Sequence, residues 1–397
     1  MDKTIMLLGG NYYQMTAVKA AKELGCHVIT VDYLPNNPAH KYADEYYNVS
    51  TTDMESVLKL ARSLKIDGIV SYASDVSAPT AAYVAEKMNL PTNPYEAVVK
   101  LTHKDLIRPF MEKYHFHTPK GMGFQKYEDA KKFFEELKNP VMIKPADASG
   151  SKGVSKIFEE WEFESAYRKA KEYSNSKTVI VEEFIEREGY QIAGDGFLID
   201  GKLVFTGFMN EHFDRLCNPL VPIGESFPSI LPKKLKEKGR TEIQRLLSYL
   251  GMKNGAVNLD FIVDKEGNIY ILEIGPRNGG NLITDAIKYA SGVDLAKYTV
   301  MSALGIDCSE LHEEPVRTFT SSYVVHAQKD GEYRGIQISD EIKKDIVRFD
   351  MFITKGEQVH RFNNGGYGMG AMIIRHKSID EMLYRMDHME EYIKLLV

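Results

Sequence analysis

The stretch Val141–Gly153, which reads VMIKPADASGSKG, joins a lysine to a loop rich in glycine and serine. An apolar strand that ends at Lys144 would hold the ammonium group as a fixed point charge. The following loop, Ser149–Gly153, can fold its backbone N–H groups around an anion. Glycine permits positive φ angles and close approach of the backbone to a ligand. These residue types and their spacing predict a phosphate-binding loop, with a solvated surface hairpin as the alternative for this segment taken alone.

Two carboxylates face each other on a predicted hairpin within Asn258–Asn281. With the turn at Glu266-Gly267, the expected register pairs Val263 with Tyr270, Asp260 with Glu273 and Asn258 with Gly275. Directly opposed residues have Cβ atoms roughly 4.5–5.5 Å apart, so the two carboxylates would repel and raise each other's pKa. A hard cation such as Mg²⁺ takes oxygen ligands and removes that conflict. A shifted register with one carboxylate in solvent is the alternative.

Three further segments carry groups suited to binding. Arg277 follows the hairpin closely, and arginine suits bidentate contact with carboxylate or phosphate. The strand Thr178–Ile185 turns acidic at its end, where its backbone groups can hydrogen-bond a flat heterocycle. Arg215 follows a strand at the expected mouth of the cleft and is a candidate for an anionic substrate group. A surface ion pair between Arg215 and Asp214 is the alternative.

The first hundred residues alternate short apolar runs with amphipathic helical patterns. We expect strands at Thr4–Leu8, His27–Val31 and Gly68–Tyr72, and helices at Thr16–Leu24, Asp53–Leu64 and Ala78–Met88. This βαβαβ order predicts a parallel sheet with helices on both faces. Gly9-Gly10 lacks the rest of a dinucleotide fingerprint, so dinucleotide binding is not expected. A helical connector is expected over Tyr95–Lys113.

A second domain is expected from Thr118-Pro119 onward. Its expected helices are Tyr127–Leu137, Trp161–Tyr173, Pro232–Leu250 and about Thr284 to Leu304. Its expected strands are Val141–Lys144, Val154–Phe158, Thr178–Phe184, Gln191–Ile199, Lys202–Asn210, Ala256–Asp264 and Asn268–Glu273. Asp200-Gly201 is typical of a tight hairpin turn. The tail from Pro315 alternates polar and β-branched residues and ends in a predicted amphipathic helix, Ile379–Leu396.

Composition narrows the class of protein. A chain of 397 residues is too long for one core and indicates two to four domains. The net charge of −6, with no basic domain, argues against a general nucleic-acid binder. Three scattered cysteines are typical of a reducing cytoplasm, and no run reaches transmembrane length. We therefore expect a cytoplasmic protein that acts on small molecules.

In chain order, Lys104, Lys144 with its loop, Glu182–Ile185, the Asp260/Glu273 pair and Arg277 resemble the ATP-grasp superfamily. The resemblance covers essentially the whole chain and implies α/β and α+β architecture. It implies a Rossmann-like pre-ATP-grasp parallel sheet (1–95), a helical connector (96–117), a two-lobed ATP-grasp domain (118–310, lobes about 118–186 and 187–310) and a small C-terminal mixed β/α domain (311–397). This layout is similar to biotin carboxylase and the purine carboxylases.

The resemblance also implies roles for individual residues. The nucleotide would be bound by Lys104, Lys144, Ser149, Gly150, Ser151, Gly153, Val154, Glu182, Glu183, Phe184, Ile185 and Gln191. Mg²⁺, or Mn²⁺ in its place, would be bound by Asp260, Glu273 and Asn278. Arg277 and Lys144 would be catalytic, and Arg277, Gly279, Gly280 and Arg215 would contact substrate.

The chain departs from the family pattern at two positions. Gln191 stands where an acidic residue usually holds the ribose, so Glu186 and Glu188 are the alternatives. Gly275 stands where an asparagine usually follows the metal glutamate, so Asn278, Asn258, Asn281 or water would supply that ligand.

The implied activity is that of an ATP- and Mg²⁺-dependent ligase. It activates a carboxylate as an acyl phosphate and joins it to an amine, releasing ADP and phosphate. A purine-type carboxylase that activates bicarbonate is the alternative with the same residues, and a nucleotide-binding protein without ligase activity is the alternative of another class. The expected partners are a small-molecule carboxylate and amine, with no nucleic acid and no membrane. A homodimer is common among relatives of this layout.

Overall fold

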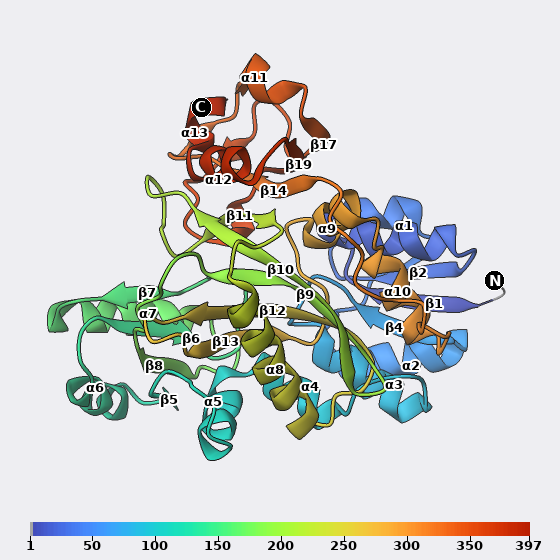
Figure 1. Ribbon diagram of the computed structural model, residues 1–397. Coiled ribbons are helices and arrows are strands. Elements are labelled where there is room, and N and C mark those ends of the chain that lie inside the picture. The colour runs from blue at the N-terminus through green and yellow to red at the C-terminus, as the bar shows by residue number, and fades with distance from the viewer. Residues whose placement is uncertain (1–2) are drawn as a thin grey trace.

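The computed structural model describes residues 3–397, and Figure 1 shows their arrangement. The N-terminal part is a parallel sheet in the order β3-β2-β1-β4, as the βαβαβ pattern predicts. Its strands are β1 (Thr4–Leu8), β2 (His27–Val31), β3 (Glu45–Tyr47) and β4 (Gly68–Ser71). Its helices are α1 (Met15–Glu23), α2 (Met54–Leu64) and α3 (Ala78–Met88). The pattern missed β3, which is only three residues long and half-buried.

The connector is helical, as predicted, and consists of two helices, α4 (Tyr95–Thr102) and α5 (Lys104–Lys113), which the sequence pattern did not separate. His103 between them is extended, with φ −125° and ψ 109°. The break places Lys104 at the first position of α5, where its backbone N–H donates to Ala146 O at 2.9 Å. This lysine is thereby fixed beside the end of the strand that carries Lys144.

The small lobe is an antiparallel sheet in the order β5-β8-β6-β7. The strands are β5 (Gly121–Phe124), β6 (Val141–Pro145), β7 (Ser155–Ile157) and β8 (Val179–Glu183). Helices α6 (Tyr127–Glu136) and α7 (Phe163–Tyr173) pack on it through a cluster that includes Phe134, Phe163 and Tyr167. The sequence did not predict β5, whose two glycines give it little β-propensity.

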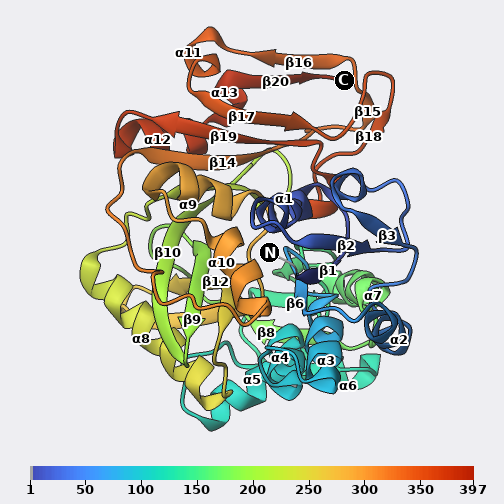
Figure 2. The same cartoon turned by 90° about the vertical axis from the view of Figure 1, so that its right-hand side faces the viewer.

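The large lobe is built on an eight-stranded sheet in the order β13-β12-β9-β10-β11-β14-β19-β17. Its strands are β9 (Ile192–Ile199), β10 (Lys202–Phe213), β11 (Pro222–Phe227), β12 (Gly255–Val263), β13 (Ile269–Gly275), β14 (Phe319–Val325), β17 (Ile346–Met351) and β19 (Gly370–His376). The turn at Asp200 and Gly201 has φ of 49° and 78°, as the predicted hairpin requires. The last three strands come from the C-terminal part, so this sheet continues past residue 310 (Figures 1 and 2).

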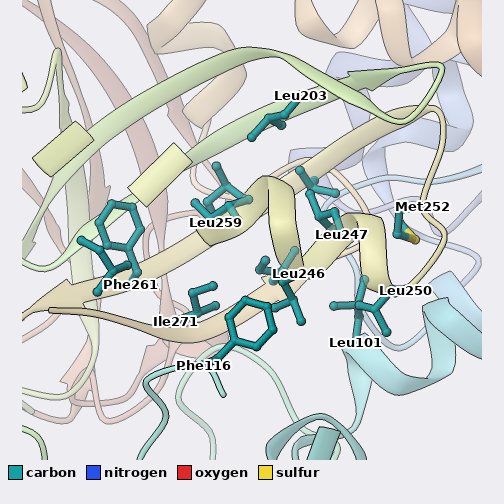
Figure 3. Close-up of a cluster of buried hydrophobic side chains, with 14 of the residues drawn as sticks. Leu101, Phe116, Leu203, Leu246, Leu247, Leu250, Met252, Leu259, Phe261 and Ile271 are labelled. Atoms are coloured by element: carbon teal, nitrogen blue, oxygen red, sulfur yellow. The ribbon is translucent and has the colours of Figure 1, made fainter. Parts of the chain in front are cut away.

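Helices cover both faces of the large sheet. Helix α8 (Lys233–Tyr249) packs through Leu246 and Leu247 against Leu259 and Ile271, as Figure 3 shows. Each such side chain contributes about 1.5–3 kcal/mol when fully buried. The opposite face receives α9 (Ile283–Ser291), with α10 (Leu295–Ala303) beside it. The single helix predicted from Thr284 to Leu304 is wrong, because Gly292 adopts φ +89° and ends α9.

The C-terminal part adds smaller elements around β14 and β19 (Figure 2). They are α11 (Asp340–Lys343), α12 (Ile379–Asp387), α13 (Met389–Tyr392), the pair β15 (Gly331–Glu332) and β18 (Gln358–Val359), and the pair β16 (Gly335–Ile338) and β20 (Ile393–Leu396). The predicted helix Ile379–Leu396 therefore ends too late: its last four residues pair with β16 and bury Ile393. Within residues 3–397 no helix has the length and apolar character needed to cross a membrane.

Candidate active site

A cleft lies between the small lobe and the end of the large sheet that β13 and β12 form. Its walls contain Lys104, Lys144, Ser149, Gly150, Ser151, Val154, Glu182, Glu183, Phe184, Ile185, Gln191, Asp260 and Glu273, all named above from the sequence. These residues come from five separate stretches of chain. A larger cavity of about 470 Å³ lies between the N-terminal part and the large lobe, and Arg277 is the one predicted site residue in its described lining.

Lys144 is held in place by a buried carboxylate. Its Nζ lies 2.5 Å from Glu182 Oε1, while Arg108 Nε donates to Glu182 Oε2 at 2.9 Å. Burial alone would raise the pKa of Glu182, but the charges and hydrogen bonds of Arg108 and Lys144 lower it to about 2. Glu182 is therefore ionised and orients Lys144 toward the cleft. The sequence predicted Glu182 as part of a nucleotide hinge and gave no sign of its contact with Arg108, because α5 lies about 70 residues earlier.

Lys104 connects the carboxylate pair to the phosphate-loop candidate. Its Nζ lies 3.1 Å from Glu273 Oε2 and donates to Ala148 O at 3.3 Å. The side chain is largely buried. Two lysines therefore approach the same end of the cleft from different elements, as a polyphosphate-binding site requires.

The hairpin brings Asp260 directly opposite Glu273, and Asn258 opposite Gly275. The predicted pairing of Val263 with Tyr270 is wrong, because Val263 pairs with Ile269. A register shift between Asp260 and Phe261 restores the expected pairing at the carboxylates. Such a β-bulge is common beside active sites, where it redirects a side chain.

The surroundings shift the pKa values of the two carboxylates in opposite directions. Burial, followed by the charge of Glu273, raises the pKa of Asp260 to about 7, although Gln191 Nε2 donates to Asp260 Oδ1 at 2.9 Å. Burial would also raise the pKa of Glu273, but the charge and hydrogen bond of Lys104 lower it overall. A pair of opposed, partly desolvated carboxylates fits a hard divalent cation. In this arrangement the amide of Gln191 contacts the pair.

The candidate phosphate loop has the backbone that its glycines and serines suggest. Gly150, Ser151 and Gly153 have φ of 68°, 55° and 72°. A Cβ on Gly153 would lie 2.9 Å from Pro145 Cγ, so the position has no room for a side chain. The loop continues into β7 and opens no helix, as the sequence predicts. Its tip contacts the C-terminal part, where Gly365 N donates to Gly150 O at 2.9 Å.

Arg277 forms a buried ion pair with Asp75 of the N-terminal part, and its Nη1 donates to Asn278 O at 3.1 Å. Its Nε and Asp75 Oδ1 are buried without a hydrogen-bond partner among residues 3–397. Arg277 therefore fastens the N-terminal part to the loop after β13, and one donor remains for a ligand. The sequence gave no sign of Asp75.

Asn278 does not reach the carboxylate pair. Its amide donates to Asp195 Oδ2 at 3.0 Å and its oxygen accepts from Thr299 at 2.7 Å. Asp195 also accepts from Gly279 N at 2.8 Å, so it organises the loop that contains Gly279 and Gly280. Arg215 is exposed and does not line the cleft. Asp214 pairs instead with His326 Nε2 at 2.9 Å, so the alternative pairing with Arg215 is absent as well.

The sequence missed several residues of the cleft. Met142, Ile262 and Leu272 supply apolar walls, while Glu211 and Arg187 supply charges. The alternation of side chains along a strand predicts that every second residue of β10 points to the same face of the sheet. It does not predict which strands border the cleft, so the sequence could not single out Glu211. The loop after β10 also contributes Pro219 and Leu220.

Comparison with known proteins agrees with this geometry. Residues 137–285 match the family model of the ATP-grasp domain. This stretch of the chain is therefore similar to an ATP-grasp domain. Two curated relatives are carbamoyl phosphate synthase large chains. The one from Clostridium botulinum is 26% identical over 275 residues, which is 67% of this chain and 25% of that protein. The one from Methanothermobacter thermautotrophicus is 25% identical over 311 residues, 76% of this chain and 28% of that protein. The chain thus spans about a quarter of the length of the curated relatives it matches.

Solved structures share the fold over the whole chain. The L-amino acid ligase from Bacillus licheniformis has a TM-score of 0.85 at 20% identity, covering 100% of this chain and 98% of that one. Phosphoribosylglycinamide synthetase from Anaerococcus prevotii has a TM-score of 0.77 at 24% identity, with 100% of both chains covered. The biotin carboxylase domain of 2-oxoglutarate carboxylase from Hydrogenobacter thermophilus has a TM-score of 0.76 at 18% identity, covering 100% and 91%. That structure was solved with MgADP, ADP and bicarbonate.

Proposed function

We propose that this chain is an ATP- and Mg²⁺-dependent ligase that activates a carboxylate as an acyl phosphate and joins it to an amine, releasing ADP and phosphate. The observation that carries the proposal is the convergence of Lys104, Lys144, the Ser149–Gly153 loop and the Asp260/Glu273 pair on one cleft. Acyl phosphate formation needs charge neutralisation and alignment more than covalent help from the protein. This set of side chains offers both.

The opposed carboxylates of Asp260 and Glu273 suit a hard divalent cation, and Glu211 adds a buried carboxylate oxygen without a partner to the same cleft. Mg²⁺ bound there would neutralise charge on the β- and γ-phosphates. Lys144 and Lys104 would bind phosphate oxygens, and the amides of Ser149–Gly153 would stabilise charge that develops on the transferred group. Closure of that loop would exclude water, which would otherwise hydrolyse the acyl phosphate.

The hinge and the apolar walls suit the nucleoside. Backbone groups at Glu183–Ile185 would hydrogen-bond the adenine, and Met142 and Leu272 would cover its faces. The Phe184 ring already carries Lys156 Nζ at 3.5 Å from its centroid, so one of its faces is occupied. Gln191 binds Asp260 in this arrangement and would have to turn to reach the ribose.

For the substrates we propose an amino acid as the class of carboxylate or amine, which the fold shared with an L-amino acid ligase supports. The alternative is activation of bicarbonate. It is supported by the curated carbamoyl phosphate synthase relatives and by the bicarbonate in the structure of the biotin carboxylase domain. Arg277 and the backbone of Gly279 and Gly280 are the candidates for contact with the acyl group.

The test is phosphate release from ATP and Mg²⁺ with a panel of amino acids in pairs. We expect substrate-dependent release of ADP and phosphate, and a loss of about 100-fold or more in kcat for Glu273→Gln, which removes a charge from the metal pair. Glu266→Gln on the turn of the same hairpin is the matched control, because Glu266 is exposed, and it should keep full activity. Incorporation of ¹⁴C-bicarbonate would favour the carboxylase. ATP binding without ADP formation under any condition would reject the ligase.

A further inference from the structure

Glu211 is a buried carboxyl group that forms no salt bridge within residues 3–397. It lies near the end of β10 and is only 6% exposed. Within residues 3–397 its Oε2 has neither solvent contact nor a hydrogen-bond partner. Arg187, the cation whose charge acts on it, makes no salt bridge to it: the Arg187 Nε donates to Gly189 O at 3.1 Å, and the guanidinium lies over the Phe213 ring. A carboxyl group desolvated in this way stays protonated unless a cation from outside the protein approaches it.

The sheet places Glu211 beside the carboxylate pair. The Glu211 N–H donates to Gln191 O at 3.0 Å, and the Gln191 side chain donates to Asp260. Strands β10, β9, β12 and β13 are consecutive neighbours, so Glu211, Gln191, Asp260 and Glu273 line one cleft in a row. Burial and the charges of Asp260 and Glu225 raise the pKa of Glu211 well above its usual range, which agrees with this closeness.

The neighbouring strand supplies a contrasting carboxylate. Glu225 pairs with Glu211 across β10 and β11 and is also buried. Its two oxygens accept hydrogen bonds from Asn281 Nδ2 at 3.2 Å and Ser322 Oγ at 2.6 Å. Glu225 does not line the cleft. It is therefore satisfied by the protein, whereas Glu211 is not.

The metal pair lacks its usual amide neighbour. Any residue with a side chain at position 275 would displace Asp75 or Arg277, because its Cβ would lie 2.8 Å from Asp75 Oδ1 and 2.9 Å from Arg277 Cζ. The amide nitrogen of Asn258 donates to Gly194 O and Asp195, and that of Asn281 donates to Glu225. Asn278 is committed to Asp195 and Thr299.

We infer that Glu211 is the third carboxylate ligand of the divalent cation held by Asp260 and Glu273, and that it takes the place of the amide ligand absent at Gly275. The inference rests on the proposed function only in its need for a metal–nucleotide complex. Three carboxylates would give a site with more negative charge than two carboxylates and an amide. The expected occupant is a hard cation of the Mg²⁺ or Mn²⁺ class.

The test measures Mn²⁺ binding to the full chain in the presence of ADP, by electron paramagnetic resonance and by calorimetry. We expect Glu211→Gln to weaken Mn²⁺ affinity by about tenfold or more. The matched control, Glu225→Gln, should stay within about twofold of the unmodified chain, because Glu225 lies outside the cleft. Glu211→Gln is nearly isosteric and keeps a neutral side chain at a site that disfavours a charged carboxylate, so its melting temperature without metal should equal or exceed that of the unmodified chain.

Two results would overturn the inference. One is an unchanged Mn²⁺ affinity in Glu211→Gln. The other is an equal loss of ADP affinity measured without any divalent metal, which would assign Glu211 to the nucleoside or to a substrate ammonium group. If the chain releases no phosphate with any substrate but the Mn²⁺ results follow the expectation, the ligase proposal fails and the metal inference stands.

Discussion

At the scale of single residues, the protein treats its buried carboxylates in two opposite ways. Glu182 lies between Arg108 and Lys144 and keeps its charge, with a pKa of about 2. Its stabilising contribution is present above the usual glutamate pKa of about 4.3 and is lost as the pH falls toward 2. Glu225 and Asp195 accept hydrogen bonds from neutral groups, and burial raises their pKa to about 7 and about 6. Only the first arrangement can hold a lysine in a fixed position.

The raised pKa of Glu225 has a consequence for stability. A carboxyl group whose pKa is higher in the folded state stabilises the fold below its unfolded pKa of about 4.3, and this contribution is lost as the pH rises through about 7. We therefore expect the metal-free chain to lose stability between pH 5 and pH 8, with Glu225 contributing about 3 kcal/mol to the loss. Urea unfolding of Glu225→Gln at both pH values should show a shallower decline than the unmodified chain. An equally steep decline would mean that Glu225 stays ionised in the folded state.

At the scale of elements, the sequence predicted most strands and helices but not the breaks between them. Apolar periodicity sets where a segment packs, so β1, β2 and α3 match their predicted bounds. The breaks at His103 and Gly292 depend on what each half must contact, which no local pattern contains. The predicted hairpin register was wrong by one residue next to the turn. The bulge between Asp260 and Phe261 shifts the register back by one residue, so the predicted pairing of Asp260 with Glu273 is correct. Partners supplied by distant elements, such as Asp75 and Arg108, could not be predicted.

The loop that follows β10 is held by hydrogen bonds to the carboxylate of Asp214. Asp214 accepts from Leu216 N at 2.6 Å, from His326 Nε2 at 2.9 Å and from Gln328 at 3.2 Å. Cys217 lies next to Asp214 and His326. Its Sγ, a carboxylate oxygen of Asp214 and a ring nitrogen of His326 all lie within 4.8 Å of one another. Pro219 and Leu220 of the same loop line the cleft. His326 therefore stabilises one wall of the cleft from the C-terminal part.

We expect His326→Ala to loosen this wall. Loss of a hydrogen bond to a charged group costs about 2 kcal/mol, so the free energy of unfolding should fall by about that amount. Amide exchange at residues 215–221 should accelerate, and KM for ATP should rise more than kcat falls. His360→Ala is the matched control, because His360 lies in the same part of the chain and is 61% exposed. Unchanged exchange at residues 215–221 would contradict the role given to His326.

At the scale of the whole molecule, three parts meet around the cleft. The large sheet runs without interruption from β13 at the carboxylate pair to β17 in the C-terminal part. The N-terminal part joins through the Asp75–Arg277 ion pair, and Thr16 and Arg348 meet at Asp285. The sequence could predict the order of these parts, because each has its own pattern of elements. The contacts between them join residues up to a few hundred positions apart and are visible only in the structure.

The contact between Gly150 and Gly365 predicts that the C-terminal part helps to hold the phosphate loop closed. Gly365→Pro removes the N–H that donates to Gly150 O, and the position accepts proline because Asn364 before it is extended and a 3₁₀ turn begins there. One hydrogen bond contributes about 1 kcal/mol, so the open loop should be about fivefold more populated. Trypsin should then cleave after the exposed Lys152 about fivefold faster with Mg²⁺ and ADP bound. Gly365→Ala keeps the donor, and its Cβ would lie 3.3 Å from Gly150 O, so it should cleave near the rate of the unmodified chain. Equal cleavage rates in all three proteins would show that the loop closes without the C-terminal part.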